Sequence, residues 1–328
     1  MSNASTDVTQ SIDIQGGSER VGWLFGGVAA LIWGGFLAVS RQGIGAGLYA
    51  SDLAFLRYLL AGPLLLPWLC RRDIRTLAGV GWRRGIVLAV LAGPLFVMVG
   101  AEGYVFAPLA HGAVIQLGTL ALAATILAVL TLGERITAAR ACGMTTIVIG
   151  LALTAGPELW RGTQTAWMGD LMFAVAGGMW AMFTILLRRW RISPLVATAI
   201  VAVLSSAAFI PLYLASHGLG IVHRASVALL VEQMLMQGLL SGIVALFAFG
   251  RAIQYLGAGR AALFPVIAPA VAILIGIPLT GEWPTAFQLA GLVTLSIGLI
   301  VSAAGGSIAR IRLFRRAANS FQQSGVSS

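Results

Sequence analysis

Three ionisable side chains, Arg57, Glu102 and His111, lie inside long apolar stretches of this 328-residue sequence. A charge in apolar surroundings is costly, so each is a candidate site residue. Carboxylate and imidazole groups can bind an ammonium group or exchange a proton when burial and neighbours shift their titration. One hypothesis has Glu102 meeting an ammonium or a proton, with His111 nearby and Arg57 as countercharge. The alternatives are a structural Arg57–Glu102 ion pair, or side chains that simply reach outer water.

Aromatic and amide side chains add further candidates. Trp33 and Trp180 fall near the middle of their apolar runs, away from the interface where Trp is usually found. They either stack on a substrate or pack in the core. Gln116 shares a helix face with Gly112 and Thr119, which is consistent with a wet path or with a hydrogen bond to a neighbouring helix.

Two prolines and one aspartate complete the set. Pro265 and Pro269, in the stretch FPVIAPA, are each expected to interrupt a backbone hydrogen bond. Inside a bilayer such a break persists only where protein or a wet cavity satisfies the freed carbonyls, which favours a kinked helix beside a cavity. We interpret Asp170 as a charge at a helix N-terminus rather than a binding residue.

Metal, cofactor and catalytic motifs are not evident. Cys70 and Cys142 form no CxxC pair, and His217 and His223 have no carboxylate or thiol cluster beside them. The sequence contains no GxSxG, HExxH or GxxxxGK[ST] motif. We therefore expect no metal, no cofactor, no enzymatic activity and no nucleotide-driven step.

The elements that position these residues follow from composition. Hydrophobic residues make up 59% of the chain and charged residues 10%, far below the roughly 25% of a soluble domain. An all-α integral membrane protein is therefore expected, with apolar runs close to the roughly 20 residues that cross a bilayer. Ten spans are predicted: 21–40, 50–70, 85–105, 109–130, 137–155, 168–187, 194–215, 229–250, 259–279 and 286–305.

Arginine placement predicts the orientation. All 21 basic residues are Arg, which in a soluble protein would point to nucleic acid, but here they lie mostly in short loops. With the N-terminus inside, 17 fall in cytoplasmic segments and three outside. By the positive-inside rule, both termini are expected in the cytoplasm. The basic tail after the tenth span is interpreted as a topology anchor, with a helix on anionic lipid as the alternative.

A repeat relates the two halves. Residues 132–155 and 280–303 are identical at ten of 24 positions, including Gly133-Glu134 and Gly281-Glu282. The first helices also align at an offset of 147, which pairs Trp33 with Trp180 and Arg41 with Arg188. Each half has five spans, so the second half begins on the opposite side of the membrane. The halves are thus inverted repeats, an arrangement suited to alternating access.

Inversion separates the two Gly-Glu motifs by the full bilayer. Glu134 and Glu282 therefore cannot form one carboxylate site, and each is expected to complement the N-terminus of the helix that follows it. Glycines seven residues apart, Gly143 with Gly150 and Gly291 with Gly298, predict close packing of the fifth and tenth helices.

These motifs resemble the drug/metabolite transporter superfamily, and most closely its EamA-type exporters. The resemblance covers about residues 21–305. It implies ten helices with both ends cytoplasmic, helices 5 and 10 at the periphery, and a central cavity lined by helices 1, 3, 4, 6, 8 and 9. Members move amino acids, other metabolites or drugs, and bacterial amino-acid exporters look most similar in length and layout.

The sequence therefore predicts a secondary transporter in the bacterial inner membrane that exports small metabolites, amino acids foremost, with protons as a candidate coupling ion. Multidrug efflux is the alternative within this fold, and a membrane enzyme, lipid-handling protein or scaffold is the alternative outside it. The expected substrate-binding residues are Trp33, Glu102, His111, Gln116, Trp180, Pro265 and Pro269. The expected segments are an N-terminal tail (1–20), the first repeat (21–155), an extracytoplasmic linker (156–167), the second repeat (168–305) and a basic C-terminal tail (306–328).

Overall fold

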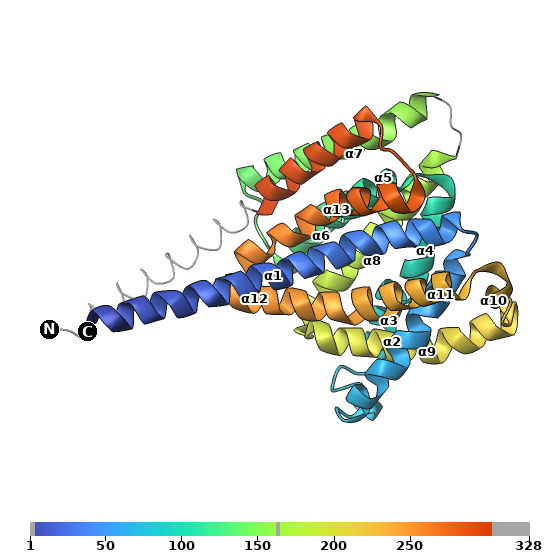
Figure 1. The fold of residues 1–328 in the computed structure, drawn as a ribbon, viewed down its shortest axis with the longest axis horizontal. Helices are drawn as coiled ribbons and strands as arrows, with labels where there is room; N and C mark the ends of the chain where they lie inside the picture. The colour runs from blue at the N-terminus through green and yellow to red at the C-terminus, as the bar shows by residue number, and fades with distance from the viewer. Residues whose placement is uncertain (1–3, 162–164, 304–328) are drawn as a thin grey trace.

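The computed structural model describes residues 4–161 and 165–303 of the chain (Figure 1). Across these residues the secondary structure is helical throughout, and ten helices are long and apolar enough to cross a membrane. The prediction of ten membrane helices is confirmed, and each predicted span overlaps one of them. The basic C-terminal tail of the prediction lies outside the described residues.

The first repeat forms five spans from nine labelled elements. They are α1 (Ala4–Gly45), α2 (Ala50–Cys70), the 3-10 turn η1 (Ile74–Thr76), α3 (Trp82–Ala92), α4 (Pro94–Phe106), α5 (Leu109–His111), the π-helix η2 (Gly112–Gln116), α6 (Leu117–Leu132) and α7 (Ala138–Arg161). Spans three and four are each built from consecutive elements, α3–α4 and α5–η2–α6. α1 begins at Ala4, so the helix extends into the segment expected to be a tail.

The second repeat follows the same plan. Its elements are α8 (Ala166–Trp190), α9 (Pro194–His217), α10 (Ile221–Arg224), α11 (Val227–Met234), the π-helix η3 (Leu235–Val244), α12 (Ala245–Ala261), α13 (Leu263–Thr280) and a last helix, Ala286–Ala303. Here the eighth span is composite, because α11, η3 and α12 run on from one another.

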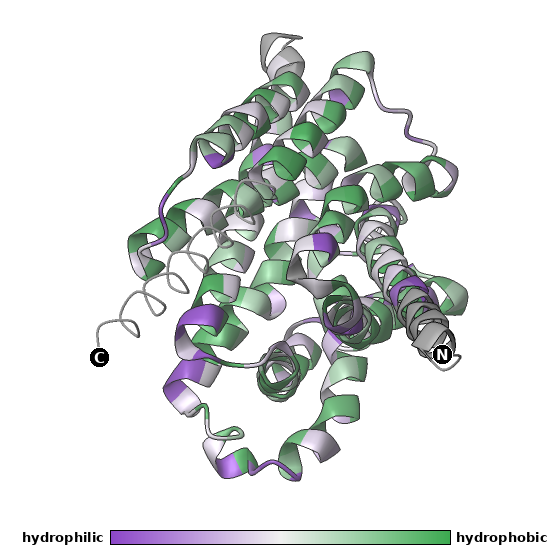
Figure 2. Cartoon of the chain, turned by 90° about the vertical axis from the view of Figure 1, so that its left-hand side faces the viewer, coloured by the Kyte–Doolittle hydropathy of each residue, from purple (hydrophilic) through white to green (hydrophobic). Residues whose placement is uncertain are grey.

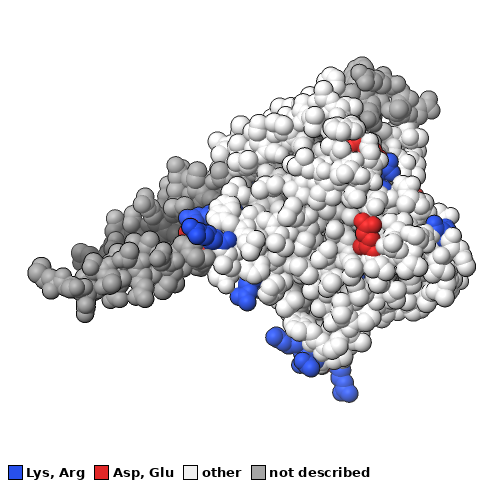
Figure 3. All heavy atoms as spheres, in the orientation of Figure 1, with Lys and Arg blue, Asp and Glu red and all other residues white. Residues whose placement is uncertain are grey.

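Most of the helical ribbon is coloured as hydrophobic in Figure 2, and many of these hydrophobic side chains are exposed on the outside of the bundle. Leu130 is 75% exposed, Leu274 70% and Val293 57%. Charged atoms are few on the face shown in Figure 3, and broad uncharged areas separate them. Such a surface is unfavourable in water but suits lipid, so the chain is a multi-pass membrane protein.

The two repeats run in opposite directions between two ends of the bundle. At one end, called here the Arg41 end, Arg41 at the end of α1 meets Glu282 after α13. At the other, the Glu134 end, Arg188 near the end of α8 meets Glu134 after α6. The fourth span joins these ends over 24 residues, about 36 Å of helix. Because Arg41 and Arg188 are equivalent in the repeat yet lie at opposite ends, the repeats are inverted.

Contacts between the repeats build the centre of the molecule. α1 packs along α13 and α12, α2 along α9, and both α4 and α6 along α8. By contrast, α7 and the helix Ala286–Ala303 lie together at the upper edge of Figure 1. Their glycines make the close approach that the sequence predicted, since a Cβ on Gly150 would lie 2.8 Å from the Leu295 backbone nitrogen. A Cβ on Gly298 would likewise lie 2.9 Å from the Gly143 carbonyl oxygen.

Three central spans depart from regular α-helix, and none of these departures was predicted from the sequence. The third is broken between Ala92 and Pro94, where the Tyr58 hydroxyl donates to the Ala92 carbonyl at 3.0 Å. The fourth and eighth contain the π-helices η2 and η3. π-Helical turns occur frequently at functional sites, so these irregular segments are candidates for the neighbourhood of a functional site.

Candidate functional site

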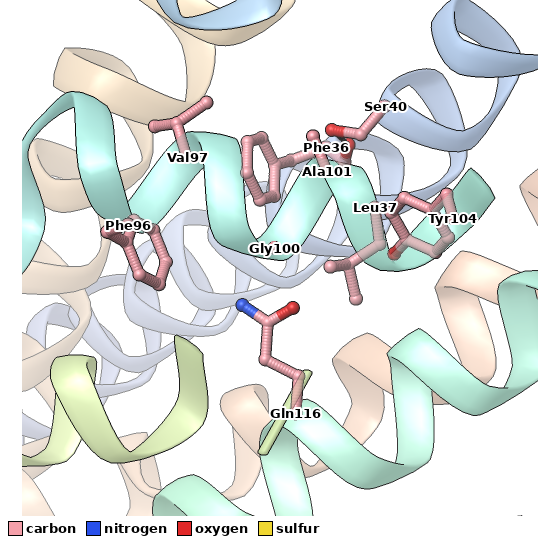
Figure 4. A pocket seen from close by; sticks show the side chains of 9 residues that line it. All are labelled: Phe36, Leu37, Ser40, Phe96, Val97, Gly100, Ala101, Tyr104 and Gln116. Atoms are coloured by element: carbon pink, nitrogen blue, oxygen red, sulfur yellow. Dashed lines mark hydrogen bonds between the residues drawn. The ribbon is translucent and has the colours of Figure 1, made fainter. Parts of the chain in front are cut away.

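A small internal cavity lies beside these irregular segments. Its lining comes from α1, α4 and η2, which are spans one, three and four of the first repeat (Figure 4). The lining residues are Phe36, Leu37, Ser40, Phe96, Val97, Gly100, Ala101, Tyr104 and Gln116. The wall is therefore mostly apolar and aromatic, with three polar side chains.

Gln116 extends from η2 toward Gly100 on α4 (Figure 4). A Cβ on Gly100 would lie 3.7 Å from the Gln116 side-chain oxygen, so the absence of a side chain there leaves room above the amide. Phe36 and Phe96 lie on the opposite side of this space (Figure 4). The arrangement combines apolar surface with a few polar groups, which is typical of small-molecule sites.

A buried polar network continues from the cavity into the second repeat. Gln237 on η3 donates to Ser40 Oγ at 2.9 Å, and Ser241 donates to the Gln237 carbonyl at 2.9 Å. Arg57 on α2 then donates through Nη1 to Ser241 Oγ at 3.1 Å. Gln233 lies one turn before Gln237, is fully buried, and donates to the Val39 carbonyl at 2.7 Å. The network ties α1 and α2 to the eighth span.

The residues of this network that lie in the second repeat are not among those predicted from the sequence. Gln233, Gln237 and Ser241 are spaced four residues apart, so they form one polar stripe on an otherwise apolar span. That spacing is a readable signal, but three neutral side chains stand out less in an apolar span than charged residues, tryptophans or prolines do. Tyr104, also a lining residue, was missed because a lone Tyr in an apolar span is ordinary.

The structure does not bring together the three ionisable residues of the first hypothesis. His111 Nδ1 lies 2.7 Å from Asp170 Oδ1, so Asp170 pairs with His111 across the repeats instead of serving only the N-terminus of α8. Arg57 bonds to Ser241, and no ion pair joins Arg57 to Glu102 in the described residues. Glu102 is half-buried on α4 and does not line the cavity.

Of the seven predicted site residues, Gln116 lines the cavity. Trp180 packs one layer behind it, with its ring centroid 5.0 Å from that of Phe96. Trp33 packs against Phe249 at 5.1 Å, away from the cavity. His111, Glu102 and the prolines lie outside the lining.

The two prolines differ from each other. Pro269 is buried inside α13, as expected for a helix-interrupting proline. Pro265 is the third residue of α13, and the first four N–H groups of a helix have no intrahelical partner. The expectation that Pro265 removes a hydrogen bond within this helix is therefore wrong.

Each end of the bundle carries an ion pair between the repeats. At the Arg41 end, Arg41 Nε donates to Glu282 at 2.6 Å and Arg41 Nη1 to the Tyr104 carbonyl at 3.2 Å. The second Glu282 oxygen accepts from the Leu109 N–H at 2.9 Å. Glu282 therefore caps the start of α5 in the other repeat. The prediction that Glu282 complements the N-terminus of the helix that follows it is wrong.

At the Glu134 end, the Glu134 carboxylate binds Arg188 and also accepts from Arg140 Nη1 at 2.9 Å. Burial acts to raise the pKa of this carboxyl, but the hydrogen bonds and charges of Arg140 and Arg188 outweigh it and hold the pKa below its usual value of 4.5. Both carboxylates of the repeated Gly-Glu motif thus bind the equivalent arginine of the opposite repeat.

Comparison with known families identifies this architecture. The model of the EamA-like transporter family matches residues 20–156 and 167–304. The chain belongs to the EamA-like transporter family. The two matches make this EamA protein a two-repeat member, and the family implies a small-molecule substrate handled in a bilayer.

Other comparisons concern the fold alone. A solved crystal structure shares 19% sequence identity with this EamA protein and has a TM-score of 0.56. The alignment covers 86% of this chain and 95% of the chain in that structure. At that identity the likeness supports the ten-helix fold and not a shared substrate. Among curated proteins, none matches this sequence.

Proposed function

We propose that this EamA protein is a secondary transporter that exports small metabolites, with amino acids as the leading substrate class, from the cytoplasm across the bacterial inner membrane. The observation that carries the proposal is the pair of symmetry-related ion pairs, Arg41–Glu282 and Arg188–Glu134, which join the two repeats at opposite ends of the bundle. We assign the Glu134 end to the cytoplasm because most loop arginines lie there.

The ion pairs supply gates for alternating access. Substrate reaches the cavity when one pair opens, and leaves when that pair closes and the other opens. Because each pair joins one repeat to the other, rocking of the repeats breaks one contact while it keeps its counterpart. Both pairs are formed here, which corresponds to an occluded arrangement around the cavity.

The Arg188–Glu134 pair is weak enough for this role. Arg188 is 51% exposed and Glu134 28%, and exposed ion pairs contribute only about 0.2–1 kcal/mol. An interaction of that size can be broken in a minor state separated by a few kcal/mol. The His111–Asp170 pair lies between the repeats near the Arg41 end, and we propose it as the candidate site for proton coupling.

The test is transport by the purified protein in proteoliposomes. We expect saturable uptake of labelled amino acids that unlabelled ones compete away, and a several-fold lower rate for Gln116→Leu, which removes the cavity amide. Gln254→Leu makes the same substitution at an exposed position of α12 and should transport at the wild-type rate. Absence of saturable flux for every amino acid would reject the amino-acid proposal. Flux of cationic dyes in its place would support multidrug efflux.

A further inference from the structure

Arg57 carries a buried charge that no carboxylate neutralises within the described part of the chain. It is 9% exposed, and its side-chain hydrogen bond goes to the neutral Ser241 hydroxyl. Its guanidinium carbon also lies 5.7 Å from the centroid of the Phe36 ring and 5.9 Å from that of Tyr58. These contacts solvate the cation in part but leave its charge uncompensated.

Other arginines near the same end of the bundle are arranged differently. Arg224 binds both oxygens of the fully buried Asp52 at 2.8 Å, and Arg41 binds Glu282. An unpaired buried cation is destabilising, whereas a paired one recovers much of its desolvation cost. A chain that pairs its neighbouring arginines but leaves Arg57 unpaired holds a position to which a counter-ion can bind.

Arg57 is one layer from the cavity. Phe36 lines the cavity on one side and packs under the guanidinium on the other. Ser40, also a lining residue, connects to Arg57 through Gln237 and Ser241. Movement of the Phe36 ring to another rotamer would open the guanidinium to the cavity.

Two further buried polar atoms lack partners among the described residues. They are the Tyr104 hydroxyl, on a lining residue that is 2% exposed, and Oε1 of the fully buried Gln237. Buried polar groups in folded proteins are normally hydrogen-bonded, so such atoms point to a ligand. The hydroxyl can donate to an anion, and the amide oxygen can accept from a donor group.

From this geometry we infer that Arg57 is the anion-binding residue of the transport site and that the substrate is a monocarboxylate with an apolar body. The inference rests on the proposed function and deepens it. One guanidinium with neutral hydroxyl and amide groups suits a single negative charge better than a phosphate dianion. The Phe36 and Phe96 rings would contact the apolar body, and Gln237 Oε1 would accept from the ammonium group if the substrate is an amino acid.

Ligand binding to the purified full-length protein in nanodiscs tests this with four probes of one shape. L-Phenylalanine and 3-phenylpropanoate carry the carboxylate, whereas L-phenylalaninamide and phenethylamine lack it. We expect the first two to raise the melting temperature of the wild type in a saturable way and the other two to bind at least ten-fold more weakly. Comparison of the first two then shows whether the ammonium group adds affinity.

Variants separate a binding role from a structural one. Arg57→Met should weaken carboxylate binding about ten- to a hundred-fold, the value of a charge-assisted hydrogen bond, and remove the preference over the amide. Because it also removes an uncompensated buried charge, we expect the ligand-free protein to melt at the same or a higher temperature. Ser241→Ala keeps the charge and should retain the carboxylate preference. Arg224→Gln, which alters a paired arginine, should also retain it.

Two results would overturn the inference. One is a wild type that binds all four probes equally, or binds neither carboxylate. The other is an Arg57→Met protein that keeps the carboxylate preference. In either case, saturable transport of another solute in the proteoliposome assay would leave the proposed function standing, so the two proposals fail separately.

Discussion

Gly100 shows how a single residue of the cavity can serve function at a cost in stability. A Cβ there would meet its nearest atoms at 3.6–3.9 Å, which is ordinary contact, so alanine fits. Replacing a helical glycine by alanine reduces the entropy of the unfolded chain, and we expect Gly100→Ala to stabilise the protein by about 0.4–1 kcal/mol. The added methyl group occupies cavity space next to Gln116, so the transport rate should fall.

Gly178→Ala is the matched control for this prediction. Gly178 lies within α8, and a Cβ there meets nothing within 4 Å. The Gly178→Ala protein should gain similar stability, and its transport rate should stay unchanged. Thermal melting and proteoliposome uptake of both variants decide the matter. Equal transport by the two would show that the space above Gln116 is not used by substrate.

Glu134 gives a prediction about pH. Its pKa is lowered in the folded protein, so the Glu134–Arg188 pair is present above the ordinary carboxyl pKa of 4.5 and is lost only as the pH falls through the lowered value. Between about pH 5.5 and 8 the carboxylate stays ionised. We expect Glu134→Gln to change the transport rate by the same factor at every pH in this range. A rate that ceases to depend on pH in this variant would make Glu134 the proton-coupling group.

At the scale of elements, the contact between α7 and the helix Ala286–Ala303 yields the sharpest stability prediction. A Cβ on Gly150 would lie 2.8 Å from the Leu295 nitrogen and 2.9 Å from the Gly291 oxygen, both backbone atoms that cannot move aside alone. Gly150→Ala should therefore separate the helices and cost about 1–3 kcal/mol, the usual penalty of overpacking. Gly156→Ala, in the same helix but with open space around it, should have no such cost.

Melting of both variants in one detergent would measure the difference. Because this pair of helices lies apart from the cavity, Gly150→Ala should keep the substrate preference of the wild type at temperatures where it remains folded. Equal melting temperatures for Gly150→Ala and Gly156→Ala would mean that the close approach contributes nothing measurable.

The same elements show what the sequence could and could not predict. Span number and the glycine contact were predictable because apolar length and the spacing of Gly143 and Gly150 are local signals. The break at Pro94 was not, because the Ala92 carbonyl that it frees is satisfied from another span, by the Tyr58 hydroxyl. The π-helices have no local sequence signal of this kind. The partner of His111 was unpredictable for the same reason. It depends on how α8 packs against the fourth span.

For the molecule as a whole, inversion makes the two ends related in sequence but unequal in strength. At the Arg41 end the paired side chains are 23% and 27% exposed, and Glu282 also holds the start of α5. At the Glu134 end Arg188 is half exposed, so water and salt weaken its pair more. We therefore expect the Glu134 end to open more readily, and more so at high salt.

Spin-label distances can report both ends of one molecule. Cys70 and Cys142 are exposed, so both need replacement by serine before labels are attached. Labels at Arg135 and Arg191, both exposed, span the repeats at the Glu134 end. Labels at Tyr49 and Trp283 span them at the Arg41 end, where these side chains are 54% and 78% exposed. In the wild type the first pair should show a larger population of long distances than the second.

Charge substitutions should then shift this balance in a predictable direction. Glu282→Gln removes the ion pair at the Arg41 end, so the Tyr49–Trp283 labels should show a larger population of long distances. Glu134→Gln should enlarge the long-distance population of the Arg135–Arg191 labels at the other end. Exchange of the charges, Arg41→Glu with Glu282→Arg, restores the attraction between repeats but not the bond to the Leu109 N–H. It should therefore reverse the shift only in part. If neither single substitution changes either distance distribution, these ion pairs are not the gates.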